Sequence, residues 1–213
     1  FTAFALAESL RPNIIVILVD DMGPGEPSYA GGIVDTPAID RIASEGINFT
    51  DGHTTSAVCT PTRYGILTGR YNWRSRLKKG VLIGATSPAL MDPERLSLPS
   101  FLKNEGYHTG IIGKWHLGVD WVVHDKKGAE YKKILDQWSP EELKKSKNFF
   151  GSWLIDYTKP FENGPIDVGF DSAFFINGSL DMPPYVYLEG DNVSKRPTEN
   201  KGWQHNEHNE FLR

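Results

Sequence analysis

A stretch of small and polar residues surrounds Cys59, which is the only cysteine among the 213 residues of the chain. The pair Thr60 and Pro61 predicts the N-cap and the first residue of a helix, because proline lacks an N–H that the first turn leaves unbonded anyway. Gly69 suits the position just past the end of that helix. Cys59 would then lie at a helix N-terminus, where free N–H groups and the helix dipole favour an anion. Arg63 follows about one turn further along the same helix.

A nucleophile-capable thiol, an anion-binding helix end and a cation within one turn together indicate chemistry on an oxyanion ester. The alternative is a buried free cysteine next to an exposed arginine, which is the commoner situation for an isolated thiol. Other parts of the chain must decide between the two.

Two adjacent carboxylates, Asp20 and Asp21, follow an apolar, mostly β-branched run at 13–19. Such a run predicts a strand that is buried on both faces of a mostly parallel sheet. Ligands of open α/β sheets bind beyond the carboxyl ends of the strands, and paired carboxylates suit a hard divalent cation such as Ca²⁺ or Mg²⁺. A solvated strand end is the alternative, because aspartate is common in turns.

A third group, Lys114 and His116, follows a predicted strand at 108–112. Residues two apart in an extended segment point to the same side. The lysine offers a point charge to an oxyanion, and the histidine can move a proton near neutral pH. Alone, this pair is as readily explained by two surface side chains.

The intervening segments alternate between helical and extended patterns. Helices are predicted at 36–46 and 97–105, each opened by a capping residue and closed by glycine. Further strands are predicted at 47–50 and 168–176. This alternation predicts an α/β fold with a parallel sheet. The polar, lysine-rich segment at about 125–160 is interpreted as an insertion on that sheet.

Composition narrows the class of protein. A net charge of −4 and a pI near 5.9 argue against nucleic acid as the main partner, and no apolar run is long enough to span a membrane. One cysteine excludes an internal disulfide. The apolar segment 1–9 ends in a small-x-small pattern and is interpreted as the remnant of a signal peptide, so we expect export to the periplasm or medium. A poorly ordered apolar N-terminus is the alternative.

Together these features resemble the sulfatase family of the alkaline-phosphatase-like superfamily. The run Cys-Thr-Pro-Thr-Arg at 59–63, followed by Ile-Leu-Thr-Gly at 66–69, looks like the first family signature. The segment 106–116, which ends in Gly-Lys-Trp-His, looks like the second, and 13–21 resembles the opening strand with its metal-binding acids. The resemblance extends from about residue 12 to residue 181. It implies a three-layer αβα fold that is incomplete at the C-terminus of this chain.

The resemblance also implies a modified nucleophile. In the family, the cysteine at the position of Cys59 is oxidised to Cα-formylglycine by a formylglycine-generating or anaerobic sulfatase-maturating enzyme, which reads the positions of Pro61 and Arg63. The hydrated aldehyde has one hydroxyl group to attack sulfur. Its second hydroxyl group can be deprotonated to expel sulfate and restore the aldehyde.

The remaining roles follow from the same resemblance. Asp20 and Asp21 would hold Ca²⁺, in preference to Mg²⁺, and this ion would also bind the oxygen derived from Cys59. The guanidinium at 63 would steady the hydrated aldehyde, Lys114 would bind a sulfate oxygen, and His116 would handle a proton.

The implied activity is release of sulfate from a sulfated sugar or polysaccharide. A cationic and aromatic run at 70–79 favours such a substrate, although a solvated loop explains it equally well. The alternatives are a formylglycine-dependent phosphonate or phosphodiester hydrolase and a non-catalytic homologue that binds sulfated glycan. Family members are considerably longer, and their remaining metal ligands (an Asp-Asn/Gln pair), second histidine and second lysine lie beyond residue 213. We therefore expect this chain alone to be inactive.

Overall fold

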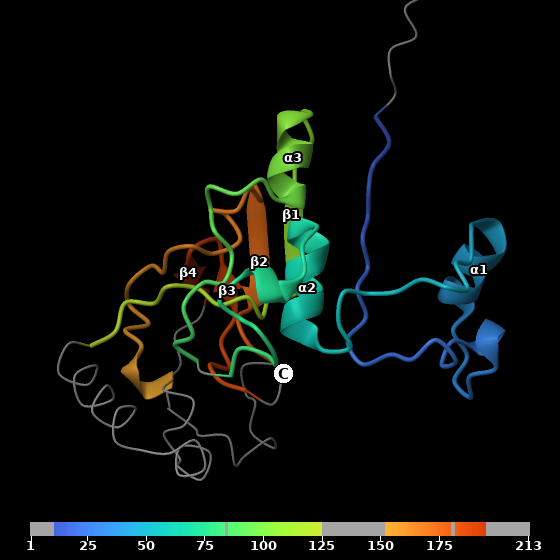
Figure 1. The fold of residues 1–213 in the computed structure, drawn as a ribbon, viewed down its shortest axis with the longest axis horizontal. Helices are drawn as coiled ribbons and strands as arrows, with labels where there is room; N and C mark the ends of the chain where they lie inside the picture. Colours follow the sequence, from blue (N-terminus) through green and yellow to red (C-terminus); the bar gives the residue numbers. More distant parts are fainter. Residues whose placement is uncertain (1–10, 84, 125–151, 180–181, 195–213) are drawn as a thin grey trace, which may run out of the picture. The chain divides into compact units, whose positions relative to one another are not determined.

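The computed structural model describes residues 11–83, 85–124, 152–179 and 182–194 (Figure 1). The chain divides into two units, Phe1–Gly52 and His53–Arg213. The segment 1–9 and most of the insertion predicted at 125–160 lie outside the described residues. In the part of the chain that is described, no helix is long and apolar enough to cross a membrane.

The first unit contains a 3-10 turn, η1 (Ser28–Ala30), and a helix, α1 (Pro37–Glu45). The helix predicted at 36–46 is thus confirmed, with proline in its first turn. Asp40 in that first turn accepts hydrogen bonds from Ser28 Oγ (2.6 Å) and Thr36 Oγ1 (2.8 Å). These bonds hold the pKa of Asp40 below its usual value and tie the two elements together.

The prediction of two strands in this unit is wrong. Residues 13–19 and 47–50 form no strand, and all are exposed. A β-branched run specifies an extended backbone, but a strand forms only where a second strand completes the ladder of hydrogen bonds. In the described residues, 13–19 has no such partner.

In its described residues, the second unit contains two α-helices, three-residue helical turns and a four-stranded sheet. Its elements are α2 (Cys59–Thr68), η2 (Asn72–Arg74), α3 (Leu98–Asn104), β1 (Gly110–Lys114), η3 (Ser152–Leu154), β2 (Ser172–Ile176), β3 (Leu188–Glu189) and β4 (Asn192–Val193). The helix predicted at 97–105 is confirmed as α3, which Ser97 and Ser100 open with a capping box. The strands predicted at 108–112 and 168–176 are confirmed as β1 and β2. Strand β1 lies two residues further along the chain than predicted, and β2 ends where predicted but begins four residues later.

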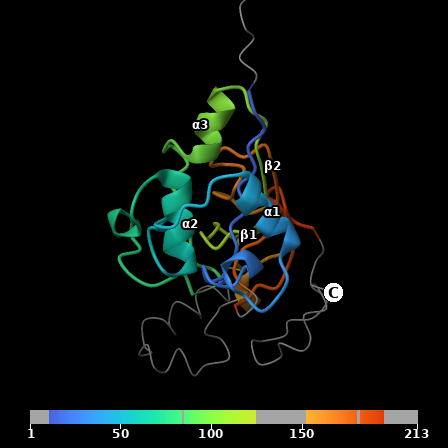
Figure 2. The same ribbon diagram turned by 90° about the vertical axis from the view of Figure 1, so that its right-hand side faces the viewer.

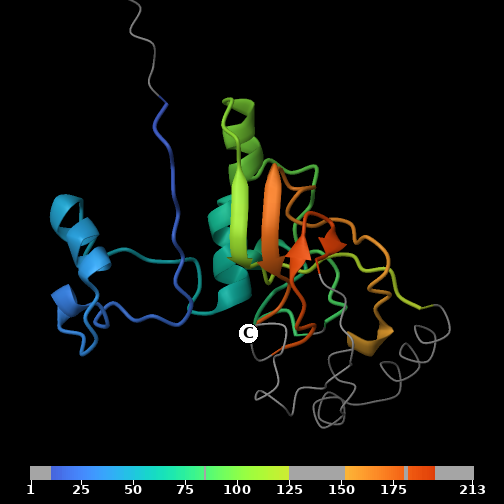
Figure 3. The same ribbon diagram turned by 180° about the vertical axis from the view of Figure 1, so that it is seen from behind.

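The strand order is β1-β2-β3-β4 (Figure 3). Strands β1 and β2 run parallel, with Lys114 opposite Ile176 at their carboxyl ends. The other neighbours are antiparallel. A loop of only two residues, beginning at Gly190 with φ 56°, joins β3 to β4, and such a loop can connect only antiparallel strands. The α/β class is confirmed, and the described sheet is mixed.

Helices α2 and α3 lie on the same face of the sheet, in front of it in Figure 1 and behind it in Figure 3. Figure 2 shows α3 above α2 along that face. The core of the unit includes Tyr64 from α2, Trp115 and Leu117 after β1, and Phe175 from β2, all buried. This packing fixes the start of α2 against the carboxyl ends of the parallel strands.

Candidate active site

Cys59 is the first residue of α2, as the sequence predicts, and it is partly exposed. The N-cap is Val58, however, and the prediction of Thr60 is wrong. Thr60 is fully buried within the helix, and its Oγ1 accepts a hydrogen bond from the Leu82 N–H (3.3 Å). Its hydroxyl group therefore fastens another loop to α2 and does not cap the helix. Cys59 still lies in the first turn of α2, where the backbone N–H groups have no partner within the helix.

The loop before Cys59 is bonded back onto the helix that follows. Thr55 Oγ1 donates to the Pro61 carbonyl (3.1 Å), and Thr62 Oγ1 donates to the Ser56 carbonyl (2.6 Å). Gly65 allows the approach, because a Cβ atom there would lie 2.1 Å from Thr55 Oγ1. The position of the thiol is therefore fixed from both sides of the chain.

Arg63 connects α2 to the second signature. Its Nη1 donates to the carbonyl oxygen of Lys114 over 2.5 Å, across 51 positions of sequence. That the arginine also points toward Cys59 stays a prediction. The contact does bring the end of β1 to the helix that carries the cysteine.

His116 is held close to the same helix. It is only 3% exposed, its Nε2 lies 2.8 Å from the Leu82 carbonyl oxygen, and its N–H donates to the Asn177 carbonyl (2.8 Å). Since Leu82 also bonds Thr60, one residue joins the start of α2 to the histidine. His116 has φ 54°, a left-handed conformation that costs a non-glycine residue about 1 kcal/mol. Such conformations gather at functional sites.

Lys114 has a partner that the sequence reasoning missed. Its Nζ donates to Ser179 Oγ (3.3 Å). Ser179 follows β2, and the carboxyl ends of parallel neighbours meet at one edge. That rule could have found Ser179 once β1 and β2 were paired. Nothing in the sequence indicates Leu82, which acts through its backbone.

Asp20 and Asp21 belong to the first unit, whereas Cys59, Arg63 and the second signature belong to the second. Both carboxylates are exposed, and Asp21 has φ 65°. Their oxygen atoms are suitable ligands for Ca²⁺, which takes six to eight. The described residues hold no cluster of three or more metal-binding side chains, and the assignment of Asp20 and Asp21 as calcium ligands stays a prediction.

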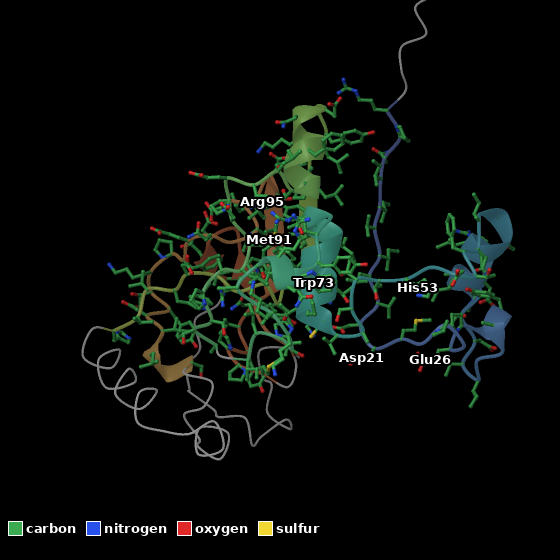
Figure 4. The ribbon with its side chains drawn as sticks, in the orientation of Figure 1. Asp21, Glu26, His53, Trp73, Met91 and Arg95 are labelled. Atoms are coloured by element: carbon green, nitrogen blue, oxygen red, sulfur yellow. The ribbon has the colours of Figure 1, made fainter. Side chains whose placement is uncertain are left out.

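The run 70–79 lies directly after α2. Trp73, labelled in Figure 4, stacks on Tyr71 with ring centroids 4.0 Å apart, and about half of each side chain is exposed. The run contains five cationic residues and no acidic one. Exposed aromatic rings beside cations can contact sugar rings and sulfate groups together.

The comparison with protein families gives one match: the family described as Sulfatase, over residues 12–178. An N-acetylgalactosamine-6-O-sulfatase of Bacteroides thetaiotaomicron is 34% identical over 186 residues, which are 87% of this chain and 30% of that protein. Bovine arylsulfatase A is 42% identical over 118 residues, 55% of this chain and 23% of that protein. Human steryl-sulfatase is 40% identical over 114 residues, 51% of this chain and 20% of that protein.

The chain is also similar to a solved structure. It comes from work on the metabolism of multiple glycosaminoglycans by Bacteroides thetaiotaomicron and superimposes with a TM-score of 0.67 at 33% identity. The match covers 87% of this chain and 32% of the other. The chain therefore spans about a third or less of the length of these relatives.

Proposed function

The chain belongs to the sulfatase family, and from that premise we propose that the complete protein releases sulfate from a sulfated carbohydrate. The observation that carries the proposal is the bond from Arg63 to the Lys114 carbonyl. It joins the helix that begins with Cys59 to the strand end that precedes His116. Two motifs that lie far apart in sequence thus contribute to one neighbourhood.

Each side chain has a role suited to its chemistry. Lys114 binds a sulfate oxygen as a point charge, with Ser179 limiting its movement. His116 accepts and returns a proton during turnover. Arg63 orients the nucleophile at position 59 and anchors the end of β1. Transfer of a sulfuryl group, like phosphoryl transfer, depends mainly on positioning and on neutralising charge.

Two further groups complete the proposal. Oxidised to Cα-formylglycine by a maturating enzyme, Cys59 would supply a hydrated aldehyde as the nucleophile. Asp20 and Asp21 would hold Ca²⁺, which would supply positive charge to offset the charge of the ester. The remaining ligands of such an ion would come from outside the described residues.

A sulfated sugar or polysaccharide is the proposed substrate. The support is twofold: the relative with 34% identity is named for a sulfated amino sugar, and the exposed aromatic pair at 71 and 73 lies among cations. The apolar segment 1–9 supports export to the periplasm or medium, where polysaccharides are degraded.

The test uses the full-length gene product, expressed in its native host or together with a maturating enzyme. Mass spectrometry of the peptide around residue 59 reports whether CH₂SH has been replaced by CHO. Paired sulfate and phosphate esters of one alcohol then give the specificity, with Cys59→Ala as the inactive control. We expect conversion at position 59 and faster sulfate release. An intact thiol with sulfated-glycan binding would instead identify a non-catalytic homologue, and faster phosphate ester hydrolysis would identify a phosphodiester or phosphonate hydrolase.

A further inference from the structure

A small cavity of about 10 Å³ lies beside His116. Its lining includes Leu82, Ser87, Asn177 and Met182. This volume is about the minimum that a single water molecule needs. A buried water also needs two to four polar partners, and the lining residues carry such groups: backbone carbonyls, the Ser87 hydroxyl and the Asn177 amide.

Asn177 is the unusual member of this lining. It is 4% exposed, and its backbone carbonyl accepts the His116 N–H. Its side-chain Oδ1 is buried and, among the described residues, has no hydrogen-bond partner. A buried amide oxygen left unpaired destabilises a fold, and native proteins retain few of them. An apolar residue of similar shape would avoid this loss of stability. The presence of an amide at position 177 therefore indicates a role other than packing.

The Leu82 carbonyl defines the state of the neighbouring ring. A carbonyl oxygen can only accept, so His116 Nε2, at 2.8 Å, carries a proton and donates it. In the neutral ring Nδ1 then carries no proton, and Nδ1 is the atom that gains and loses the proton during turnover. Whatever holds the Leu82 carbonyl and the His116 backbone in place also holds the ring in this tautomer.

We propose that Asn177 is a positioning residue for His116 and acts through one water molecule in this cavity. The water donates one hydrogen bond to Asn177 Oδ1, and its second hydrogen goes to the free lone pair of the Leu82 carbonyl. Asn177 thereby supports His116 twice, through its own carbonyl on the backbone and through the water on the group that fixes the ring. The proposal rests on the proposed function, in which His116 moves a proton.

The test compares Asn177→Ser and Asn177→Ala in the full-length protein, since the two variants differ by one oxygen atom. We expect the alanine variant to lose at least tenfold in kcat with KM within twofold of the wild type. The serine variant, which keeps an acceptor, should recover most of that loss. The melting temperature of the alanine variant should lie close to that of the serine variant. Equal kcat for the two variants would overturn the proposal.

A spectroscopic measurement keeps this test separate from the proposed function. Ring ¹⁵N signals of histidine-labelled protein, with His116 assigned from a His116→Gln spectrum, report the tautomer without any substrate. We expect the Nε2–H form in the wild type and in Asn177→Ser, and a mixed signal in Asn177→Ala. Absence of sulfatase activity in the wild type would contradict the proposed function but not the positioning role of Asn177. Identical ring signals in all three proteins would contradict the proposal that Asn177 positions His116.

Discussion

Arg63 donates to the Lys114 carbonyl from Nη1 of a planar guanidinium group, and a lysine ammonium does not reproduce that fixed donor geometry. We expect Arg63→Lys in the full-length protein to lower kcat/KM by about 100-fold, the usual effect of removing one positioned donor. Arg41→Lys, at an exposed arginine on α1, is the matched control and should leave kcat/KM unchanged.

The peptide around residue 59 must be analysed by mass spectrometry in the same preparation. The family resemblance implies that the maturating enzyme also reads Arg63. An unconverted cysteine in the variant would assign the loss to maturation, whereas full conversion with full activity would contradict the positioning role.

Trp73 and Tyr71 form the exposed stacked pair beside the cations of the 70–79 run. If this pair contacts sugar rings, Trp73→Ala should raise KM for a sulfated polysaccharide about three- to tenfold. KM for 4-nitrocatechol sulfate, which has no sugar ring, should not change. Phe101→Ala, at an equally exposed aromatic residue on α3, serves as the control. An equal rise in KM for both substrates would argue against a sugar-binding role.

At this scale, sequence reasoning found the residues that carry distinctive chemistry. Cys59 was placed correctly at the helix start, because proline and glycine mark helix ends through backbone geometry. Thr60 was misassigned as the cap, since nothing local reveals that its hydroxyl group bonds Leu82. Asn177 and Ser179 were missed because their roles depend on which strands become neighbours.

Among the elements, α2 depends on a glycine for its contact with the preceding loop. A methyl group at Gly65 would overlap Thr55 Oγ1, Cγ2 and Cβ. We expect Gly65→Ala to lower the free energy of unfolding by about 1–3 kcal/mol, because overpacking forces the loop away from the helix. Urea unfolding measures this change. Gly25→Ala, where nothing lies within 4 Å, should be nearly neutral, and equal effects of the two substitutions would contradict the steric argument.

The amino ends of β1 and β2 are joined by Asp171, which accepts hydrogen bonds from Lys103 Nζ (2.7 Å) and the Thr109 N–H (2.8 Å). These bonds, the lysine first, lower the pKa of Asp171 from 3.8 to about 2. The carboxylate therefore stabilises the fold fully above the unfolded-state pKa of 3.8. This contribution is lost as pH falls toward about 2.

Replacing Asp171 by Asn should remove that contribution at neutral pH. The melting temperature of the variant should fall less steeply than that of the wild type between about pH 5 and pH 2. Thermal unfolding monitored by circular dichroism across this range provides the measurement. Parallel curves for the two proteins would show that the carboxylate does not stabilise the folded state.

Helices were easier to predict than strands, and the reason is physical. The limits of α1 and α3 are set by capping residues, prolines and glycines within the same short segment. A strand needs a partner elsewhere in the chain. The run 13–19 has the composition of a buried strand, but in the described residues it finds no such partner. Even where β1 and β2 were predicted, local patterns could not give their exact limits.

At the scale of the whole molecule, one face of the sheet exposes large apolar side chains. Ile112 is 86% exposed and Phe174 is 41% exposed. Both side chains lie on one face of the sheet, and the buried Ala173 and Phe175 lie on the other face. No described helix of the second unit covers this face (Figure 3). The pattern at 168–176 predicts a strand, but a local pattern cannot say which elements cover the two faces of a sheet.

The candidate calcium site also lacks ligands, and this leads to a prediction for the 213-residue chain by itself. Ca²⁺ requires six to eight oxygen ligands, and the candidate site offers the two carboxylates Asp20 and Asp21. The chain also spans only 30% of the relative that it matches at 34% identity. We expect the 213-residue polypeptide, purified alone, to give no turnover of 4-nitrocatechol sulfate, even with Ca²⁺ and a converted residue 59. The full-length gene product, treated identically, should be active. Measurable hydrolysis by the polypeptide alone, abolished by Cys59→Ala, would prove that these residues already contain a complete site.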